Sequence, residues 1–309
     1  MAWLGWVVVS PEQASPQADG PQTDKWHRWL RELRHGGDSE YQQEILERVH
    51  GVRDEVLDRA CLQPNDALLD VGTGDGLVAF GALDRLGAAG HVIFSDISMD
   101  LLDHCRAVAA ANGQLARCNF LVASADRLDG IADGSVDVVT TRSVLIYVAD
   151  KAAAFAEFRR VLRPGGRISL HEPINVLMNT CDPGIFFGYS VGPVAAHAAK
   201  ITRAYDSIQP RQDPMGDFDE RDLVRFAEQA GFAEVNLDLR VTVKSRQRPT
   251  QWEVFLRASA NPLVPPVGEV MNDALSPAEA AEFTAHLRPL VESGIGVDRL
   301  ALAYLSAVC

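Results

Sequence analysis

The stretch that decides the fold is Leu-Leu-Asp-Val-Gly-Thr-Gly-Asp-Gly, residues 68–76. A short apolar run over residues 67–71 predicts a buried strand, and the glycines that follow predict a tight turn. Helical spacing of apolar residues begins directly afterwards, over residues 77–86. In an open α/β sheet, ligands lie outside the carboxyl ends of the strands, so we expect the ligand site of this protein at that turn.

The alternation of strand and helix continues along the chain. Strands are predicted at residues 91–95, 119–122, 136–140 and 167–170, and helices at residues 99–112, 151–162 and 219–230. Strands separated by helices of ten or more residues imply a parallel sheet with helices on both faces. Two later strands, at residues 235–243 and 299–308, bring the prediction to a mostly parallel, seven-stranded, Rossmann-like α/β fold.

Composition and charge narrow the class of protein. The chain has 309 residues, of which 47% are hydrophobic and 23% charged, enough for a buried core. The formal net charge of −13 disfavours binding to DNA or RNA. No stretch is long and apolar enough for a membrane helix, and the apolar start lacks the cationic leader of a signal peptide. We therefore expect a cytoplasmic protein with neither membrane insertion nor a nucleic-acid partner, and leave homo-oligomers open.

The cysteines indicate neither a disulfide framework nor a metal site. Their number is odd and no two are spaced as C-x-x-C. They are Cys61, Cys105, Cys118, Cys181 and Cys309. We expect free thiols in a reducing compartment and no bound metal.

The glycine turn indicates what kind of ligand binds. Its spacing is G-x-G-x-G, whereas a dinucleotide fingerprint needs G-x-G-x-x-G, and position 77 is Leu. Asp70 precedes the turn and Asp75 lies within it, and carboxylates so close would repel a pyrophosphate. S-adenosylmethionine carries a sulfonium and an ammonium and no phosphate, so the sign of the local charge favours this cofactor.

Asp96 ends the second predicted strand, twenty residues after Gly76. A carboxylate at this place can accept hydrogen bonds from both hydroxyls of a ribose. The alternative is that Asp96 caps the following helix, a role that Ser98 could fill instead. Together with the glycine turn, the position favours ribose binding.

Four segments in order resemble one family. They are residues 68–76, 95–98, 133–139 and 160–167, the last reading Arg-Val-Leu-Arg-Pro-Gly-Gly-Arg. Together they look like the class I S-adenosylmethionine-dependent methyltransferases, near the ubiquinone/menaquinone C-methyltransferase-like branch. The resemblance covers roughly residues 65–172, a third of the chain.

The resemblance implies positions for the cofactor. Asp70, Gly72 and Gly74 would meet its amino-acid end, Asp96 its ribose and Ile97 its adenine. The adenine amino group is often bound by an acid after the third strand, but here Ser124 stands where that acid is commonest and Asp126 follows two residues later. The contact is left open between them. The remaining implied site residues are Thr73, Ala125, and, near the sulfur, Arg142 and Ser143.

Composition and periodicity along the chain divide it into segments. They are a flexible leader (1–25), an N-terminal helical cap (26–64), the cofactor-binding core (65–172), an insertion that forms a lid over the acceptor (173–217), and the rest of the sheet (218–309) with a second insertion at about 249–296. The cap, around Trp26, Trp29, Arg34 and Tyr41, covers the cofactor, completes the face of the sheet, or does both. Tyr41 is its expected cofactor contact.

The acceptor side follows from the chemistry of methyl transfer. Displacement at a sulfonium is in line, and a general base is needed only if the acceptor must lose a proton. His171 and Glu172 end the fifth strand, so they are candidates for base and orienting carboxylate, or they cap the strand. The insertion is rich in aromatic residues that line the acceptor site or form the insertion's own core, which favours a hydrophobic small molecule such as a natural-product intermediate or a quinol-like ring. These residues are Phe186, Phe187, Tyr189, His197 and Tyr205.

Two other functions remain open from the sequence. A nicotinamide-dependent oxidoreductase could share the fold, although the glycine spacing and the acids speak against it. A protein that binds S-adenosylmethionine without transferring its methyl group, as a scaffold or in a rearrangement, would carry the same motifs.

Overall fold

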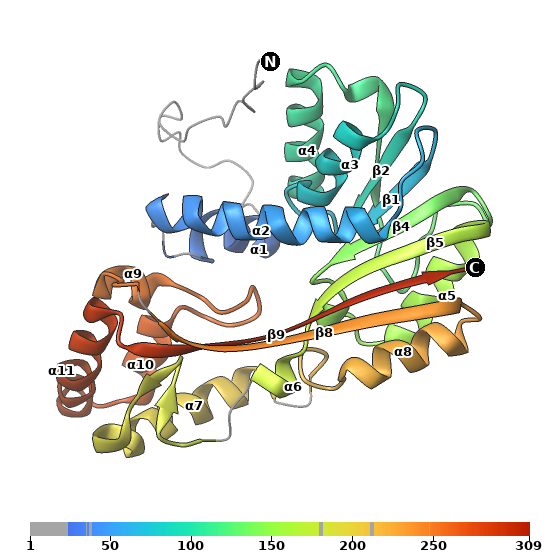
Figure 1. Ribbon diagram of the computed structural model, residues 1–309. Helices are drawn as coiled ribbons and strands as arrows, with labels where there is room; N and C mark the ends of the chain where they lie inside the picture. Colours follow the sequence, from blue (N-terminus) through green and yellow to red (C-terminus); the bar gives the residue numbers. More distant parts are fainter. Residues whose placement is uncertain (1–23, 35, 37–38, 179–181, 211–212, 247) are drawn as a thin grey trace.

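The computed structural model describes residues 24–34, 36, 39–178, 182–210, 213–246 and 248–309, without the side chains of residues 39–45. Figure 1 shows a twisted sheet covered by helices on both faces, with an arm of two long strands leading to a separate group of helices. Among the described residues, no helix combines the length and the apolar character needed to cross a membrane.

The sheet has seven strands, the number that the sequence predicts, and their order is β3-β2-β1-β4-β5-β9-β8. The first five are parallel, and β9 runs antiparallel to both of its neighbours. Their bounds are β1 (Ala67–Val71), β2 (His91–Asp96), β3 (Cys118–Val122), β4 (Val136–Arg142), β5 (Leu162–Pro173), β8 (Ala233–Arg246) and β9 (Gly296–Val308). The carboxyl ends of β1, β2 and β4 meet at the edge where the glycine turn leaves the sheet.

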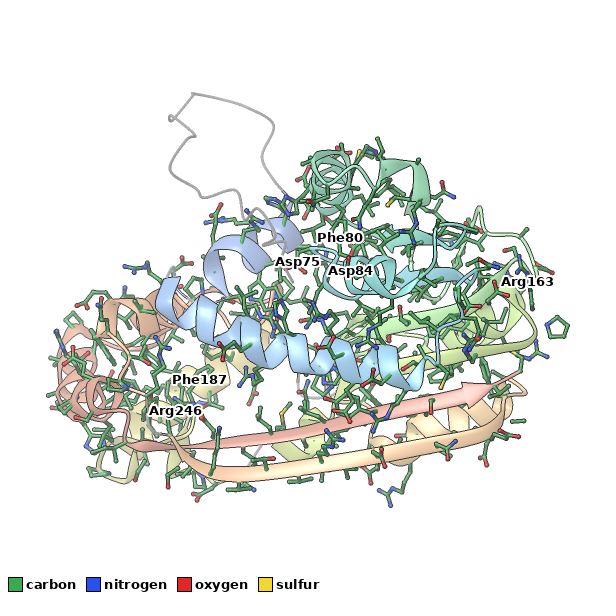
Figure 2. All side chains as sticks on the ribbon, turned by 45° about the horizontal axis from the view of Figure 1, so that its top comes forward. Asp75, Phe80, Asp84, Arg163, Phe187 and Arg246 are labelled. Carbon is green, nitrogen blue, oxygen red and sulfur yellow. The ribbon has the colours of Figure 1, made fainter. Side chains whose placement is uncertain are left out.

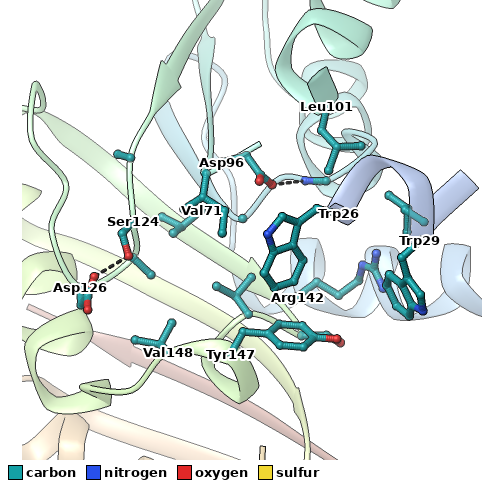
Figure 3. A pocket seen from close by; sticks show the side chains of 18 of the residues that line it. Trp26, Trp29, Val71, Asp96, Leu101, Ser124, Asp126, Arg142, Tyr147 and Val148 are labelled. Carbon is teal, nitrogen blue, oxygen red and sulfur yellow. Dashed lines mark hydrogen bonds between the residues drawn. The ribbon is translucent and has the colours of Figure 1, made fainter. Parts of the chain in front are cut away.

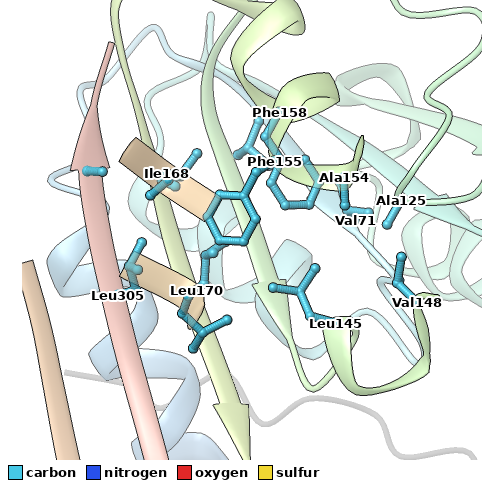
Figure 4. Packing of buried hydrophobic residues seen from close by; sticks show 14 of the residues in the cluster. Val71, Ala125, Leu145, Val148, Ala154, Phe155, Phe158, Ile168, Leu170 and Leu305 are labelled. Carbon is cyan, nitrogen blue, oxygen red and sulfur yellow. The ribbon is translucent and has the colours of Figure 1, made fainter. Parts of the chain in front are cut away.

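Helices cover both faces of the sheet. One face packs against α2 (Ser39–Arg59), α3 (Leu77–Arg85) and α4 (Met99–Ala111), the other against α5 (Lys151–Val161) and α8 (Glu220–Gln229). The second face holds the largest cluster, in which Phe155 and Phe158 of α5 pack against Ile168, Leu170 and Leu305 (Figure 4). In β1 and β2 the apolar residues therefore alternate between two separate cores.

Capping side chains set where several helices begin. Ser98 caps α4, its hydroxyl accepting the N–H of Leu101 at 3.1 Å. Asp219 caps α8, and Ser276 caps α11 (Pro277–Ser293) with Pro277 in its first turn, the start that the sequence predicts. These caps satisfy backbone N–H groups that have no partner within the helix.

The N-terminal cap consists of α1 (Lys25–Arg28), a π-helical turn η2 (Trp29–Leu33) and the long helix α2. Asp24 starts α1 by accepting the N–H groups of Trp26 and His27. It also accepts a hydrogen bond from the Ser98 hydroxyl, and its own N–H donates to Asp100. Thus α1 is tied to the first turn of α4, directly beside the end of β2.

An arm and a helical lobe depart from the rest of the fold. β8 and β9 pair from end to end, but β9 pairs with β5 only over Leu302–Val308, so the remainder of the two strands forms a two-stranded arm. Figure 2 shows Arg246 at the lobe end of the arm, beside Phe187. Arg246 lies over the Tyr189 ring and bonds Asp298. The arm therefore anchors the lobe.

Both insertions build one hydrophobic core in the lobe. Phe186 and Tyr189 from the first insertion pack with Trp252, Phe283 and Leu287 from the second. The elements are β6 (Ile185–Phe186), β7 (Tyr189–Ser190), η5 (Gly192–Val194), α7 (Ala195–Ile208), α9 (Trp252–Arg257), α10 (Val267–Ala274) and α11; α6 (Asn175–Met178) lies against β9, and η3 (Leu115–Arg117) precedes β3. From the sequence, the two insertions are predicted as separate segments, because nothing in the spacing of their apolar residues indicates a shared core.

Three strands are longer than the sequence predicts. β5 begins at Leu162, because the residues around Pro164 and Gly165 form an irregularity where pairing with β4 shifts from Leu162 to Arg167. β8 and β9 extend past the sheet because each supplies the other's backbone partners. Hydrophobic periodicity predicts where a strand is buried, and these extensions are largely exposed.

Replacing Phe155 by Ala tests the core under α5. The ring is fully buried between Phe158 and Phe226, so its loss should lower the free energy of unfolding by about 3–5 kcal/mol in urea denaturation. Phe187→Ala is the control, because this side chain is 39% exposed, and it should lower the free energy of unfolding clearly less. A Phe155→Ala cost no larger than that of the control would contradict the packing described.

Candidate functional site

A cavity of about 220 Å³ lies at the carboxyl ends of β1, β2 and β4 (Figure 3). The glycine turn borders it on one side, and α1 and η2 of the N-terminal cap cover it. Its lining residues are Trp26, Trp29, Leu30, Arg34, Val71, Gly72, Gly74, Asp96, Ile97, Leu101, Ala123, Ser124, Ala125, Asp126, Arg142, Ser143, Val144, Tyr147, Val148 and Ala149. The place predicted for the ligand is thus a partly open cavity with a partly aromatic wall.

Position 72 requires a glycine because the Val144 side chain lies directly against it. Its φ is +62°, and a Cβ atom there would lie 2.4 Å from Cγ2 of Val144. Val144 belongs to residues 143–149, the β4–α5 loop, which includes η4 (Leu145–Tyr147). Glycine at this position therefore lets the β4–α5 loop approach the turn, in addition to leaving room for a ligand.

Asp70 holds the glycine turn in place from the side away from the cavity. Its carboxylate is buried and accepts hydrogen bonds from the Thr73 hydroxyl at 2.8 Å and the Thr140 hydroxyl at 2.7 Å. Burial raises the pKa of Asp70 to about 6, against these hydrogen bonds and the charge of Arg142. Neither Asp70 nor Thr73 lines the cavity, so both act on a ligand through the turn they hold.

Asp96 stands at the end of β2 with both carboxylate oxygens directed by the backbone. One oxygen accepts the N–H of Gly74 and the other that of Ser98, each at 2.9 Å. Burial raises the pKa of Asp96, while these hydrogen bonds lower it. Since Ser98 is the cap of α4, Asp96 is not needed for that role and keeps free lone pairs toward the cavity.

The far end of the cavity combines an exposed apolar side chain with two polar ones. Ile97 is 51% exposed and lines the cavity, a suitable surface for a flat ring. Ser124 and Asp126 both line it, and the Ser124 hydroxyl donates to Asp126. The two candidates that the sequence leaves open thus form one hydrogen-bonded pair.

The N-terminal cap supplies the aromatic wall. Trp26 and Tyr147 meet edge to face, with ring centroids 4.9 Å apart. Trp29 donates from Nε1 to the carbonyl of Ser259 at 3.1 Å, which ties η2 to the segment after α9. Arg34 lies over the Trp29 ring. The cap thus covers the cavity and joins it to the lobe.

Glu172 holds the β4–α5 loop. Its buried carboxylate accepts the backbone N–H groups of Val144, Leu145 and Ile146 at 2.9, 3.0 and 3.4 Å. Burial raises the pKa of Glu172 to about 7, although these hydrogen bonds favour the charged form. Glu172 does not line the cavity, and its geometry is that of a positioning residue for the loop that does.

His171 lies under α2 and also outside the cavity lining. Its ring packs edge-on against Tyr304, and neither ring nitrogen has a hydrogen-bond partner in the described part of the chain. Burial and the charge of Arg142 lower the pKa of His171 to about 3, so the ring is neutral near pH 7 and a weak base.

The cavity gathers most of the residues that the sequence suggests for a cofactor. Those that line it are Gly72, Gly74, Asp96, Ile97, Ser124, Ala125, Asp126, Arg142 and Ser143. The side chain of Tyr41 lies outside the described ones. Sequence reasoning missed Leu30, Leu101, Tyr147 and Val148; of these, Tyr147 could be suspected from its place five residues after β4.

A second cavity, of about 640 Å³, lies between the lobe and α6. Of the insertion's aromatic residues, Phe186, Phe187 and Tyr205 line it, whereas Tyr189 is in the lobe's core and His197 bonds Glu282 on α11. The other lining residues are Asn175, Val176, Met178, Ile185, Gly188, Thr202, Asp206, Gln209, Pro210, Asp213, Met215, Gly216, Ala260, Asn261 and Val264.

Comparison with known proteins places this site in a family. A model of the ubiE/COQ5 methyltransferase family matches residues 46–242, well over half of the chain. The chain belongs to this family. The matched residues include the glycine turn, Asp96 and the β4–α5 loop, so most of the residues that line the cavity lie within the match to the family model.

Individual relatives match over shorter lengths. An arsenite methyltransferase from Halobacterium salinarum is 32% identical over 115 residues, 37% of this chain and 29% of that protein. A nocamycin O-methyltransferase from Saccharothrix syringae is 35% identical over 156 residues, 50% of each chain. The chain thus spans at most half the length of these relatives. A solved structure from Bacillus halodurans, 16% identical, has a TM-score of 0.51 over 83% of this chain and 97% of that one, a likeness of fold.

Replacing Glu172 by Gln tests the buried charge behind the cavity. Its pKa is raised from 4.5 to about 7 in the folded protein, so folding takes up a proton and wild-type stability falls as the pH rises between these values. The glutamine of Glu172→Gln does not titrate. In urea denaturation, the free energy of unfolding of this variant should therefore rise relative to that of wild type by roughly 3 kcal/mol between about pH 5 and about pH 8.

Glu157→Gln is the control for this comparison. The pKa of Glu157 is lowered by the hydrogen bond from Arg160, so its stabilisation is present above its unfolded pKa and is lost only in more acidic solution. Its difference from wild type should stay constant over the same pH range. Parallel pH profiles for wild type and Glu172→Gln would contradict the buried charge.

Proposed function

We propose that the chain transfers a methyl group from S-adenosylmethionine to a small-molecule acceptor. The observation that carries this is the arrangement of one cavity, in which the glycine turn, the buried Asp96 carboxylate and the exposed Ile97 follow one another. This order suits the amino-acid end, ribose and adenine of that cofactor. The names of the relatives, an O-methyltransferase and an arsenite methyltransferase, support transfer to a small acceptor.

The residues present fit the cofactor chemically. Asp96 keeps lone pairs for two ribose hydroxyls, while backbone N–H groups fix the direction of its oxygens. Ser124 and Asp126 can share the adenine amino group. The rings of Trp26 and Tyr147 offer π-faces and edges near the centre of the cavity, where they can accommodate a cationic sulfur. When bound, the cofactor supplies the methyl group and its leaving group.

The chain's own contribution is positioning and exclusion of water. The Asp70 and Glu172 carboxylates hold the two loops that border the cavity. The N-terminal cap, tied down at Asp24 and Trp29, shields it from solvent. We assign Glu172 to positioning on this geometry. Base catalysis by His171 stays a prediction, as do the cytoplasmic location and any homo-oligomer.

We further propose that the acceptor's apolar part occupies the second cavity. The segment after α9 contacts both cavities: the carbonyl of Ser259 holds Trp29 of the first, while Ala260 and Asn261 line the second. Aromatic and sulfur-containing side chains there suit a hydrophobic ring, and carboxamides could orient its polar groups. This assignment gives the lobe the role of an acceptor lid.

Binding of S-adenosylhomocysteine tests the cofactor site. Asp96→Ala should weaken binding about 10- to 100-fold in calorimetry, the value of one or two hydrogen bonds to a charged group. Asp103→Ala, which removes an exposed carboxylate of α4, is the matched control and should bind like wild type. No binding by wild type, or equal affinity of Asp96→Ala, would contradict the proposal.

Methyl transfer to a panel of hydrophobic phenols, quinols and acids tests the acceptor site. With methyl-labelled cofactor, we expect transfer to at least one apolar ring and stoichiometric S-adenosylhomocysteine. Phe187→Ala should raise the acceptor's KM without changing the affinity for S-adenosylhomocysteine, and Ile208→Ala, at an exposed residue of α7 outside the cavity, should change neither. Transfer to proteins alone would overturn the assignment.

A further inference from the structure

The strand β8 forms one edge of the seven-stranded sheet and of the arm. It pairs with β9 in unbroken register from Asn236 to Arg246, and Figure 1 shows it at the outer margin of the sheet. In an antiparallel pair, alternate residues direct their N–H and C=O groups away from the partner strand. Among the described residues, no other strand takes up these groups along roughly 33 Å of β8.

One face of this edge strand is apolar and exposed. Leu237 packs against the core under α8, and Leu239, Val241 and Val243 continue the same face along the arm. Their exposed fractions are 37, 53 and 53%, and we call these three residues the apolar stripe. No proline interrupts β8. A long apolar edge strand of this kind is a template for pairing with another strand.

The other face of β8 carries charges of both signs. Asp238 is 64% exposed and bonds Arg59, and Arg240 bonds Glu55. Lys244 is exposed, and its side chain has no ion pair or hydrogen bond within the described part of the chain. The free edge thus presents an anion and a cation on one face, just beyond the two ends of the apolar stripe.

A second copy of the strand matches this pattern when it runs antiparallel about a two-fold axis perpendicular to the sheet. Such an axis keeps equivalent faces together, so the register is defined by the residue that lies opposite itself. With Val241 at the axis, Asp238 of each copy lies opposite Lys244 of the other. On the apolar face, Leu239 lies opposite Val243. The whole regular stretch of the strand is then paired.

Moving the axis by one residue removes this match. With Arg240 at the axis the arginine lies opposite itself, and with Thr242 there it lies opposite Lys244. Like charges directly opposite destabilise a strand pair, whereas opposite charges stabilise it. An axis at Leu239 would pair Asp238 with Arg240, but it extends the pairing into the irregular start of β8, where the register with β9 shifts. The charges and the strand's regular length therefore favour the first register.

We propose that the chain forms a homodimer by antiparallel pairing of β8 with β8 of a second copy, with Val241 at the two-fold axis. Pairing satisfies the outward backbone groups, brings the two apolar stripes into lateral contact and creates two ion pairs. Because the axis uses the β8 edge of both copies, assembly stops at two chains. Residues 233–246 line neither cavity, so the proposal is independent of methyl transfer.

Sedimentation of the full chain over a concentration series tests the interface. Wild type should have twice the mass of one chain. Val241→Lys places two ammonium groups opposite each other at the axis and should raise the dimer's Kd about 10- to 100-fold. Val122→Lys is the matched control, because this valine is 51% exposed and lies on β3, the opposite edge of the sheet. It should dimerise like wild type.

Charge reversal separates pairing from any effect on folding. Asp238→Lys and Lys244→Glu, each alone, place like charges opposite each other at both ends of the stripe and should raise the Kd about 10-fold. The two changes in one chain restore opposite charges and should return the Kd to within about 3-fold of wild type. Since Asp238→Lys loses the contact with Arg59 in either background, that contact does not account for the recovery.

Four results would overturn the proposal. They are a wild type that stays monomeric throughout the series, a dimer that Val241→Lys leaves intact, a loss of dimer that the combined charge reversal does not restore, and dissociation by Val122→Lys in place of Val241→Lys. The last result would assign the interface to the β3 edge.

Discussion

Two buried carboxylates hold the loops between which the cavity forms. Asp70 connects the glycine turn to β4 by accepting hydrogen bonds from Thr73 in the turn and from Thr140 in the strand. Glu172 accepts three successive backbone N–H groups of the β4–α5 loop. Gly72 and Val144 then meet so closely that no side chain fits between them. Charged acceptors make strong hydrogen bonds, but burial raises the pKa of both acids. The site is therefore shaped by groups that do not line it.

The N-terminal cap depends on this frame and completes it. α1 is fixed to α4 through Asp24, and η2 to the segment after α9 through Trp29. Because that segment belongs to the lobe, one short stretch of chain contacts the cofactor cavity and the unit that we assign to the acceptor. The Trp29–Ser259 hydrogen bond is the direct connection between the cap and that unit.

The sequence predicts the sheet well, and most of the residues that it suggests for a cofactor line one cavity, but it predicts the rest poorly, for physical reasons. Buried strands and capped helices leave local patterns, so β1 to β5 and the start at Ser276 are confirmed. Position along a strand also places Asp96 and Arg142 in one cavity. By contrast, whether His171 and Glu172 point toward a ligand depends on the fold of other segments, and the shared core of the two insertions is purely tertiary.

A crystal structure of the chain with S-adenosylhomocysteine is the most direct test of the account. It should show the ribose hydroxyls on Asp96, the adenine against Ile97 and beside Ser124 and Asp126, and the sulfur near the centre of the cavity below Trp26. The loop held by Glu172 should keep its three hydrogen bonds. Ligand density elsewhere, or adenine at the opposite end of the cavity, beside Trp29 and Arg142, would contradict the account.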